Sequence, residues 1–117
     1  MSLLAKLLWG NLNSHEFTGG IRYGKDYYDA INASWPFAKL AIARENIALS
    51  IFWKSFSISR NQLKRIVKYS GAFSQGIRIE HTMKGCPPFI VFWTRNVDGV
   101  TSKLAENGFI LNEEISN

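Results

Sequence analysis

Two histidines and one cysteine are the side chains of this sequence best suited to nucleophilic or metal chemistry. His81 and Cys86 lie five residues apart across a glycine-containing loop, so a cysteine–histidine nucleophile is the first hypothesis. Such a pair needs contact between the side chains and a third group that orients the imidazole. His81 continues the alternating row of Ile77 and Ile79, which points into a predicted sheet, and no third group is identifiable. We therefore interpret His81 as a structural histidine.

Metal, phosphate-loop and carboxylate chemistry have less support. His15, His81 and a single cysteine match no ligand spacing for zinc. The only adjacent carboxylates are Glu113 and Glu114, near the C-terminal end. No glycine loop followed by Lys and Ser or Thr is present to bind phosphates. We expect a protein that is not an enzyme and that uses neither a cofactor nor a metal.

The strongest charge signal is a basic block at residues 46–79. It carries six basic residues and no acidic one, in a chain of net charge +5. Such a block attracts the phosphates of lipids or nucleic acids. The candidate phosphate-binding residues are Lys54, Arg60, Lys64, Arg65 and Lys68. The alternative, which we favour, is that these cations lie on solvated strand faces and keep the domain soluble.

Length and composition fit one folded domain. The chain has 117 residues, of which 46% are hydrophobic and 20% are charged. This profile excludes a disordered segment and provides a core without disulfides or metals. No apolar run reaches the ~20 residues that span a bilayer. A single cysteine suits a reducing compartment, so we expect a cytoplasmic protein, with attachment to the membrane surface as the alternative.

The first residues predict a short N-terminal helix. Leucines recur there at helical spacing, at positions 3, 4, 7 and 8. Lys6 interrupts the apolar run and no Ala-x-Ala cleavage pattern follows, which argues against a secretory signal. We expect the helix to pack on the domain or on a partner, and a shallow anchor in a membrane interface is the alternative.

Alternating hydrophobicity predicts a series of short strands, and it is clearest from residue 37 onward. The predicted strands are residues 37–43, 47–53, 55–59, 60–69 with a bulge, 77–82 and 89–93, after a short strand at 17–23 that two glycines interrupt. The strand at 89–93 is apolar on both faces and is therefore expected to be central. Residues 24–34 are expected to be irregular.

One helix is predicted near the C-terminal end. Asn96 or Asp98 is the N-cap, and Gly108 ends the helix after about ten residues. Its apolar face contains Val97, Val100 and Leu104. Residues 110–117 are expected to form an acidic tail.

Aromatic residues at strand spacing are expected to lie mostly in the core. Phe52 and Trp53 face opposite ways in a strand, so at least one of them should leave the interior. The residues concerned are Trp35, Phe37, Phe52, Trp53, Phe56, Phe89, Phe92 and Trp93.

Several stretches of the chain resemble one family of small domains. They are residues 33–40 (ASWPFAKL), 56–60 (FSISR), 63–66 (LKRI), 76–81 (GIRIEH), 88–93 (PFIVFW) and 104–109 (LAENGF). Together they resemble pleckstrin-homology-like (PH-like) and GRAM-like domains, many of them bacterial, over residues 33–109. The resemblance implies a mainly β, PH-like barrel of about seven antiparallel strands capped by one C-terminal helix. Residues 1–32 would be an N-terminal extension.

The resemblance leaves the ligand open, because PH-like domains bind phosphoinositides, dock on proteins or oligomerise. Phosphoinositide binders place Lys and Arg between the first two strands, a connection expected here at residues 44–46, with one base and one acid. We therefore expect a non-enzymatic interaction module that binds a protein partner or a second copy of itself. Peripheral binding to anionic lipid through residues 54–68 is the first alternative, and weak nucleic-acid binding is the second.

Overall fold

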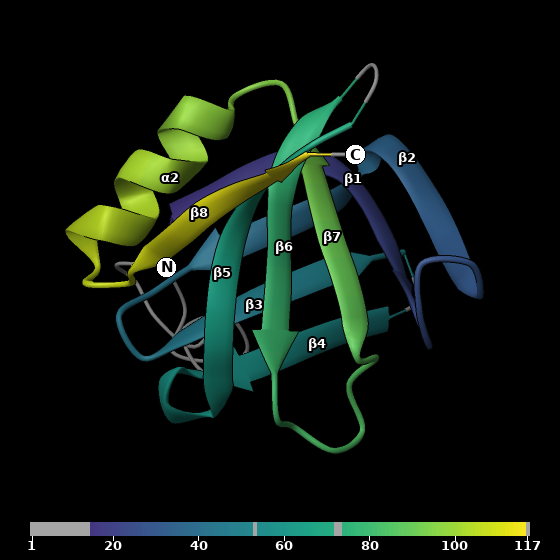
Figure 1. Ribbon diagram of the computed structural model, residues 1–117, viewed down its shortest axis with the longest axis horizontal. Coiled ribbons are helices and arrows are strands. Elements are labelled where there is room, and N and C mark those ends of the chain that lie inside the picture. Colours follow the sequence, from purple (N-terminus) through teal and green to yellow (C-terminus); the bar gives the residue numbers. More distant parts are fainter. Residues whose placement is uncertain (1–14, 53, 72–73, 117) are drawn as a thin grey trace, which may run out of the picture.

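The computed structural model describes residues 15–52, 54–71 and 74–116, and within them eight strands form one sheet that curls into a half-barrel (Figure 1). The elements are β1 (His15–Gly24), β2 (Ala30–Ile42), β3 (Asn46–Ile51), β4 (Lys54–Ser59), the 3-10 turn η1 (Arg60–Gln62), β5 (Leu63–Ser70), β6 (Gln75–His81), β7 (Phe89–Thr94), α2 (Val97–Glu106) and β8 (Leu111–Ser116). The order across the sheet is β4-β3-β2-β1-β7-β6-β5-β8. All neighbouring strands are antiparallel except β5 and β8.

Hydrophobic alternation places the strands largely as predicted. In β4, Phe56 and Ile58 are buried while the serines between and beside them are exposed. β7, which is apolar on both faces, pairs with β1 and β6 at the centre of the sheet. The predicted bulge of β5 lies between Leu63 and Arg65, although its first three predicted residues form η1. Alternating hydrophobicity therefore predicted most strands, and the run at residues 89–93, which is apolar on both faces, lies at the centre of the sheet as expected.

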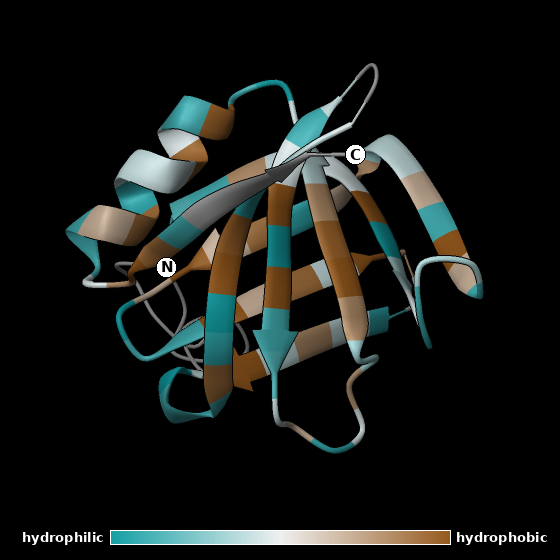
Figure 2. Ribbon diagram, in the orientation of Figure 1, coloured by the Kyte–Doolittle hydropathy of each residue, from teal (hydrophilic) through white to brown (hydrophobic). Residues whose placement is uncertain are grey.

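Helix α2 closes one end of the half-barrel with the predicted face. The Gly99 N–H donates to the side chain of Asn96 at 3.0 Å, which identifies Asn96 as the N-cap. Gly108, with φ of +83°, follows the helix in the left-handed region. Figure 2 shows hydrophobic residues on the side of the helix that faces the sheet. The buried residues of α2 are Val97, Val100 and Leu104.

A second apolar cluster covers the outer face of the sheet at β5 and β7. Tyr69, Phe89 and Val91 are buried there, with Ala30 and Trp93 packed against them. The ring of Tyr69 lies 5.4 Å from that of Trp93. The centre of the sheet is thus apolar on both faces, which explains why β7 lacks polar residues before Thr94.

Three expectations from the sequence need correction. The sheet has eight strands among the described residues rather than about seven. Irregular backbone is confined to residues 25–29 instead of 24–34, because β1 extends to Gly24 and β2 begins at Ala30. Residues 111–116 form β8 beside β5 instead of an acidic tail. The sheet thus includes strands on both sides of residues 33–109, the stretch that carries the family resemblance. The predicted N-terminal helix lies outside the described residues.

The first two strands are also joined by a different connection from the expected one. β1 lies between β2 and β7, so the first connection of the sheet is residues 25–29 (KDYYD) rather than residues 44–46. The sequence pattern places the first strand of the barrel at residues 37–43, one strand too late, because the two glycines of β1 interrupt its alternating hydrophobicity.

An irregular stretch of β2 brings an aromatic residue across β1. Gly19 pairs with Ala38 but Ile21 pairs with Ala33, so residues 34–37 have no partner in β1. This stretch passes close over Gly20, where an added Cβ would lie 2.9 Å from the Ala33 carbonyl oxygen. Glycine is required at this crossing because only a hydrogen fits between the two backbones.

Candidate functional site

The five predicted phosphate-binding residues come from three elements. Lys54 begins β4 and Arg60 follows its end, which separates them by about 20 Å of strand. Lys64, Arg65 and Lys68 lie on β5. Arg60, Lys64 and Arg65 line a shallow groove of about 330 Å³ beside the end of α2. Three of the five cations are therefore neighbours, and Lys54 is not among them.

The guanidinium of Arg60 forms hydrogen bonds within the protein. It donates hydrogen bonds to the carbonyl oxygens of Arg44 at 2.8 Å, Asn107 at 2.9 Å and Gly108 at 2.7 Å. The same group lies 4.4 Å from the ring centroid of Phe109. A cation at the C-terminal end of a helix also interacts favourably with the helix dipole. Arg60 thus ties η1 to the end of α2.

Arg65 is paired as well. Its Nη2 donates to Glu80 Oε2 at 2.8 Å, and Arg78 Nε lies 3.8 Å from the same oxygen. The hydrogen bond from Arg65 holds the pKa of Glu80 below its ordinary range, and the same bond raises the pKa of Arg65. Lys54 lies over two rings, 5.4 Å from the centroid of Phe56. Lys64 and Lys68 have no ion pair among the described residues.

The Glu80 carboxyl should titrate below its ordinary pKa of 4.5 in a carbon-detected NMR titration. A lowered folded-state pKa means that the pair stabilises the fold above the ordinary pKa, and that this contribution disappears as the pH falls through the lowered value. The effect on stability should be small because the pair is partly exposed. Arg65→Gln should raise the pKa of Glu80, and an unchanged titration curve would contradict the pairing.

The contacts of His81 and Cys86, the candidate nucleophilic pair, indicate structural roles for both residues. His81 Nε2 donates to the Pro87 carbonyl at 2.8 Å, while Nδ1 accepts from the Met83 N–H at 3.0 Å. The described residues contain no hydrogen bond between His81 and Cys86. Burial raises the pKa of the Cys86 thiol, which disfavours the nucleophilic thiolate. Both ring nitrogens of His81 are therefore used to fix the loop that leads into β7.

Exposed aromatic residues gather on one side of the molecule. Seven large hydrophobic residues are exposed within the described residues, and six of them belong to β2, the β1–β2 loop or the turn after β3. Phe37 and Phe52 lie side by side, with ring centroids 4.9 Å apart. We call this surface the aromatic flank, and its members are Tyr27, Tyr28, Ile31, Trp35, Phe37 and Phe52. In Figure 1, the β1–β2 hairpin lies at the opposite end of the molecule from α2.

The aromatic flank departs in part from the expectation of a core role. Phe56, Phe89 and Phe92 are buried as expected, whereas Trp35 and Phe37 are about half exposed. Phe52, 68% exposed, leaves the interior at the turn. The sequence carried a signal for this surface, because residues 30–38 (AINASWPFA) contain no charged residue to keep an exposed strand solvated.

One edge of β2 is unpaired along the aromatic flank. β2 pairs with β1 at residues 30–33 and 38–42, but with β3 only at residues 39–42. The second edge of residues 30–38 therefore has no strand beside it among the described residues. A strand edge without a neighbouring strand presents the N–H and C=O groups that point to it as a template for pairing, except at Pro36, which has no N–H.

A groove lies beside the aromatic flank, where the irregular stretch of β2 crosses β1. It has a volume of about 810 Å³. Its floor is β1 and the end of β7, and its walls are β2 on one side and Gly71, Ser74 and Gln75, at the ends of β5 and β6, on the other. The lining residues include Trp35, Trp93, Arg95, Asn32, Gln75 and Gly71. Among the described residues that line the groove, Arg95 has the single charged side chain.

Comparisons with known proteins give no family for this chain. No protein-family model matches the sequence, and a search of the curated proteins finds no match. Within the described residues, no three or more His, Cys, Asp or Glu side chains are grouped so as to hold a metal ion. The helices in the described ranges lack the length and apolar character needed to cross a membrane.

Proposed function

We propose that this protein is a non-enzymatic interaction module of the PH-like type, and that it self-associates through its aromatic flank. The PH-like part of the proposal is supported by the meanders β1–β4 and β5–β7, followed by a helix that closes the half-barrel. The interaction part rests on one observation, which is the gathering of six exposed large hydrophobic residues around an unpaired strand edge.

The composition of the aromatic flank supports a protein contact. Tyr, Trp and Phe are enriched at interfaces because they bury a large area for few rotatable bonds. Two pairs of these rings are in contact, Tyr27 with Tyr28 at 5.3 Å and Phe37 with Phe52 at 4.9 Å, and exposed groups of large apolar side chains often mark interaction sites. Tyr28 is 91% exposed although its ring lies edge-on to that of Tyr27, so most of its surface stays in water. Covering these rings would remove apolar surface from water.

The ionic side chains around the aromatic flank carry a small positive excess. They are five cations and three carboxylates, with Arg22 over the Tyr27 ring and Arg95 over the Trp35 ring: Arg22, Lys25, Lys39, Lys54, Arg95, Asp26, Asp29 and Glu16. Lys39 and Glu16 already pair at 3.5 Å. A membrane or nucleic acid is attracted by a large positive excess, and the excess of two charges on this surface attracts it only weakly. The same small excess repels a second copy little at physiological ionic strength, and the free edge of β2 can pair with its own copy across a two-fold axis.

Sedimentation velocity of the purified protein tests this proposal. The expected result is a monomer–dimer equilibrium with a Kd on the order of 10–100 µM, as befits a small interface. Ile31→Lys places a charge on the free edge and should leave a monomer at every concentration. Ile110→Lys makes the same change at a residue that is 82% exposed outside the aromatic flank, and it should still dimerise.

Two outcomes would overturn the proposal. One is a wild-type protein that stays monomeric up to about 1 mM, well above the expected Kd. The other is equal dimerisation by wild type and Ile31→Lys. Flotation with vesicles that contain anionic lipid is a second experiment, which tests the alternative of membrane binding. A monomer that binds these vesicles, and loses binding on Lys64→Glu with Lys68→Glu, would assign the chain to peripheral membrane attachment instead.

A further inference from the structure

The groove beside the aromatic flank has the chemical character of a small-ligand site. Its volume of about 810 Å³ falls in the range of ligand pockets, about 300–1,000 Å³. Two indole side chains, those of Trp35 and Trp93, line it together with the amides of Asn32 and Gln75. The groove thus combines two aromatic faces with several polar side chains, so it can hold a ligand that has both an apolar and a polar part.

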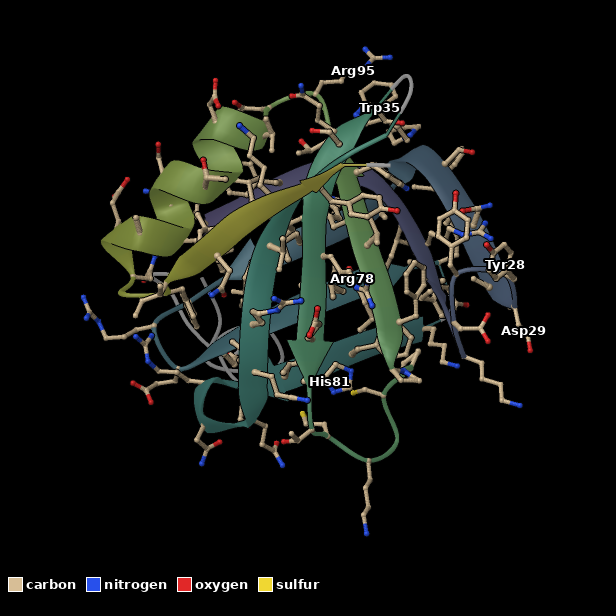
Figure 3. All side chains as sticks on the ribbon, in the orientation of Figure 1. Tyr28, Asp29, Trp35, Arg78, His81 and Arg95 are labelled. Carbon is tan, nitrogen blue, oxygen red and sulfur yellow. The ribbon has the colours of Figure 1, made fainter. Side chains whose placement is uncertain are left out.

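Arg95 is the side chain that gives the groove its specificity. Its guanidinium lies 4.1 Å from the ring centroid of Trp35, and Figure 3 shows the two side chains together at the top of the molecule. Stacking on an indole uses the flat face of a guanidinium and leaves its N–H groups free at the edge. No described carboxylate pairs with Arg95, and no described residue accepts a hydrogen bond from it.

This arrangement differs from that of the other stacked arginines. Arg60 also lies over a ring, but three carbonyl oxygens take its donors. Arg22 lies over Tyr27 and donates to the Tyr27 carbonyl, and Arg78 lies over Phe89 with its Nε 3.8 Å from Glu80 Oε2. Arg95 is thus held in position by Trp35 with its hydrogen-bonding edge unused by the described residues. A positioned guanidinium without an internal acceptor is complementary to an oxyanion, which it can bind through two parallel hydrogen bonds.

We propose that the groove binds a small ligand that carries an oxyanion on an aromatic ring. The oxyanion, a carboxylate or a phosphate, takes the free edge of Arg95. The ring packs on the indole of Trp93. None of the described residues lining the groove is acidic, so none of them repels a negative charge. The inference does not depend on self-association, because the groove is formed within one chain.

Gly71, in the wall of the groove, offers a way to change the size of the groove without changing its charge. A Cβ added at Gly71 would lie 3.4 Å from the Trp93 ring, which is ordinary van der Waals contact. Gly71→Ala should therefore be tolerated while a methyl group occupies part of the space proposed for the ligand ring. This variant separates the contribution of the ring from that of the oxyanion.

Titrations followed by two-dimensional ¹H–¹⁵N NMR test the proposal with four probes: benzoate, phenyl phosphate, benzamide and acetate. Benzoate or phenyl phosphate should shift the indole N–H signals of Trp35 and Trp93 and the side-chain N–H signal of Arg95. The charged ring-bearing probe should bind at least about tenfold tighter than neutral benzamide, since charge-assisted hydrogen bonds are the stronger kind. Acetate should bind more weakly than benzoate because it lacks the ring.

Variants make the test specific to the proposed residues. Arg95→Gln should weaken the charged ring-bearing probe about tenfold. Arg44→Gln removes another exposed arginine, outside the groove, and should change nothing. Gly71→Ala should weaken benzoate and leave acetate unchanged. The NMR spectra themselves report whether each variant is folded. Three results would overturn the proposal. The first is equal binding of benzamide and benzoate, and the second is an equal effect of the two arginine variants. The third is the absence of any shift with any probe at about 10 mM, a concentration that detects even weak binding.

Discussion

Replacing Gly76 by alanine is expected to destabilise the protein by about 3–4 kcal/mol, a large effect for a single added methyl group. A Cβ at this position would lie 1.9 Å from the Phe92 carbonyl oxygen and 2.8 Å from the Phe92 carbonyl carbon. These are backbone atoms of β7, so no side chain can rotate to make room. The strand itself would have to move away from β6. Urea denaturation of the purified variant measures the loss.

Gly71→Ala is the matched control for this prediction. Its added methyl group would meet the ring of Trp93 at 3.4 Å, without overlap. The free energy of unfolding should change by less than about 1 kcal/mol, since the backbone at Gly71 is not in the left-handed region. Similar stabilities for Gly76→Ala and the wild type would contradict the pairing of β6 with β7.

Arg60→Met is expected to destabilise the protein by about 2–3 kcal/mol. The substitution removes the donors to the carbonyl oxygens of Arg44, Asn107 and Gly108, and it removes one of the cations at the end of α2. Arg60→Lys should restore only part of the loss, because one ammonium group cannot reproduce the planar fork of a guanidinium. Thermal and urea denaturation measure both variants.

Lys64→Met serves as the control for Arg60→Met. It removes a neighbouring exposed cation that has no ion pair among the described residues, and should change the stability by less than about 0.5 kcal/mol. If Arg60→Met were as stable as Lys64→Met but failed to bind anionic vesicles, Arg60 would be a phosphate ligand and its assigned structural role would be wrong.

Local patterns were sufficient to predict β7 and α2. The run from Phe89 to Trp93 is apolar at every position, and only a strand covered on both faces accommodates that. The helix carries its own N-cap in Asn96 and its own terminator in Gly108. These signals act over a few residues, so no knowledge of the tertiary structure was needed.

The formation of β1 and β8 depends on pairing with strands distant in the sequence, and the local hydrophobicity pattern carries no information about that pairing. β1 has consecutive glycines because it crosses β2 and β7 at close range, and those glycines break the alternation. β8 carries Glu113 and Glu114, which are uncommon in central strands, but it is an edge strand. It became a strand because the chain leaving α2 runs parallel to β5.

The candidate site could be predicted only in part for a similar reason. A block of cations in sequence does not say which of them find internal acceptors, and Arg60 and Arg65 both do. The role of Arg95 depends on contact with Trp35, sixty residues away in the chain. Exposure of Trp35 follows from the irregular stretch of β2, which an apolar pattern alone does not reveal.

Hydrogen exchange at the free edge of β2 tests the proposed self-association most directly. We expect the amide protons of residues 30–35 that point away from β1 to become better protected as the protein concentration rises through the dimerisation range, while those of β8, at the other edge of the sheet, do not change. The same amide protons should stay unprotected in Ile31→Lys. Dimerisation with unchanged exchange at residues 30–35, or with protection of β8 instead, would contradict the account.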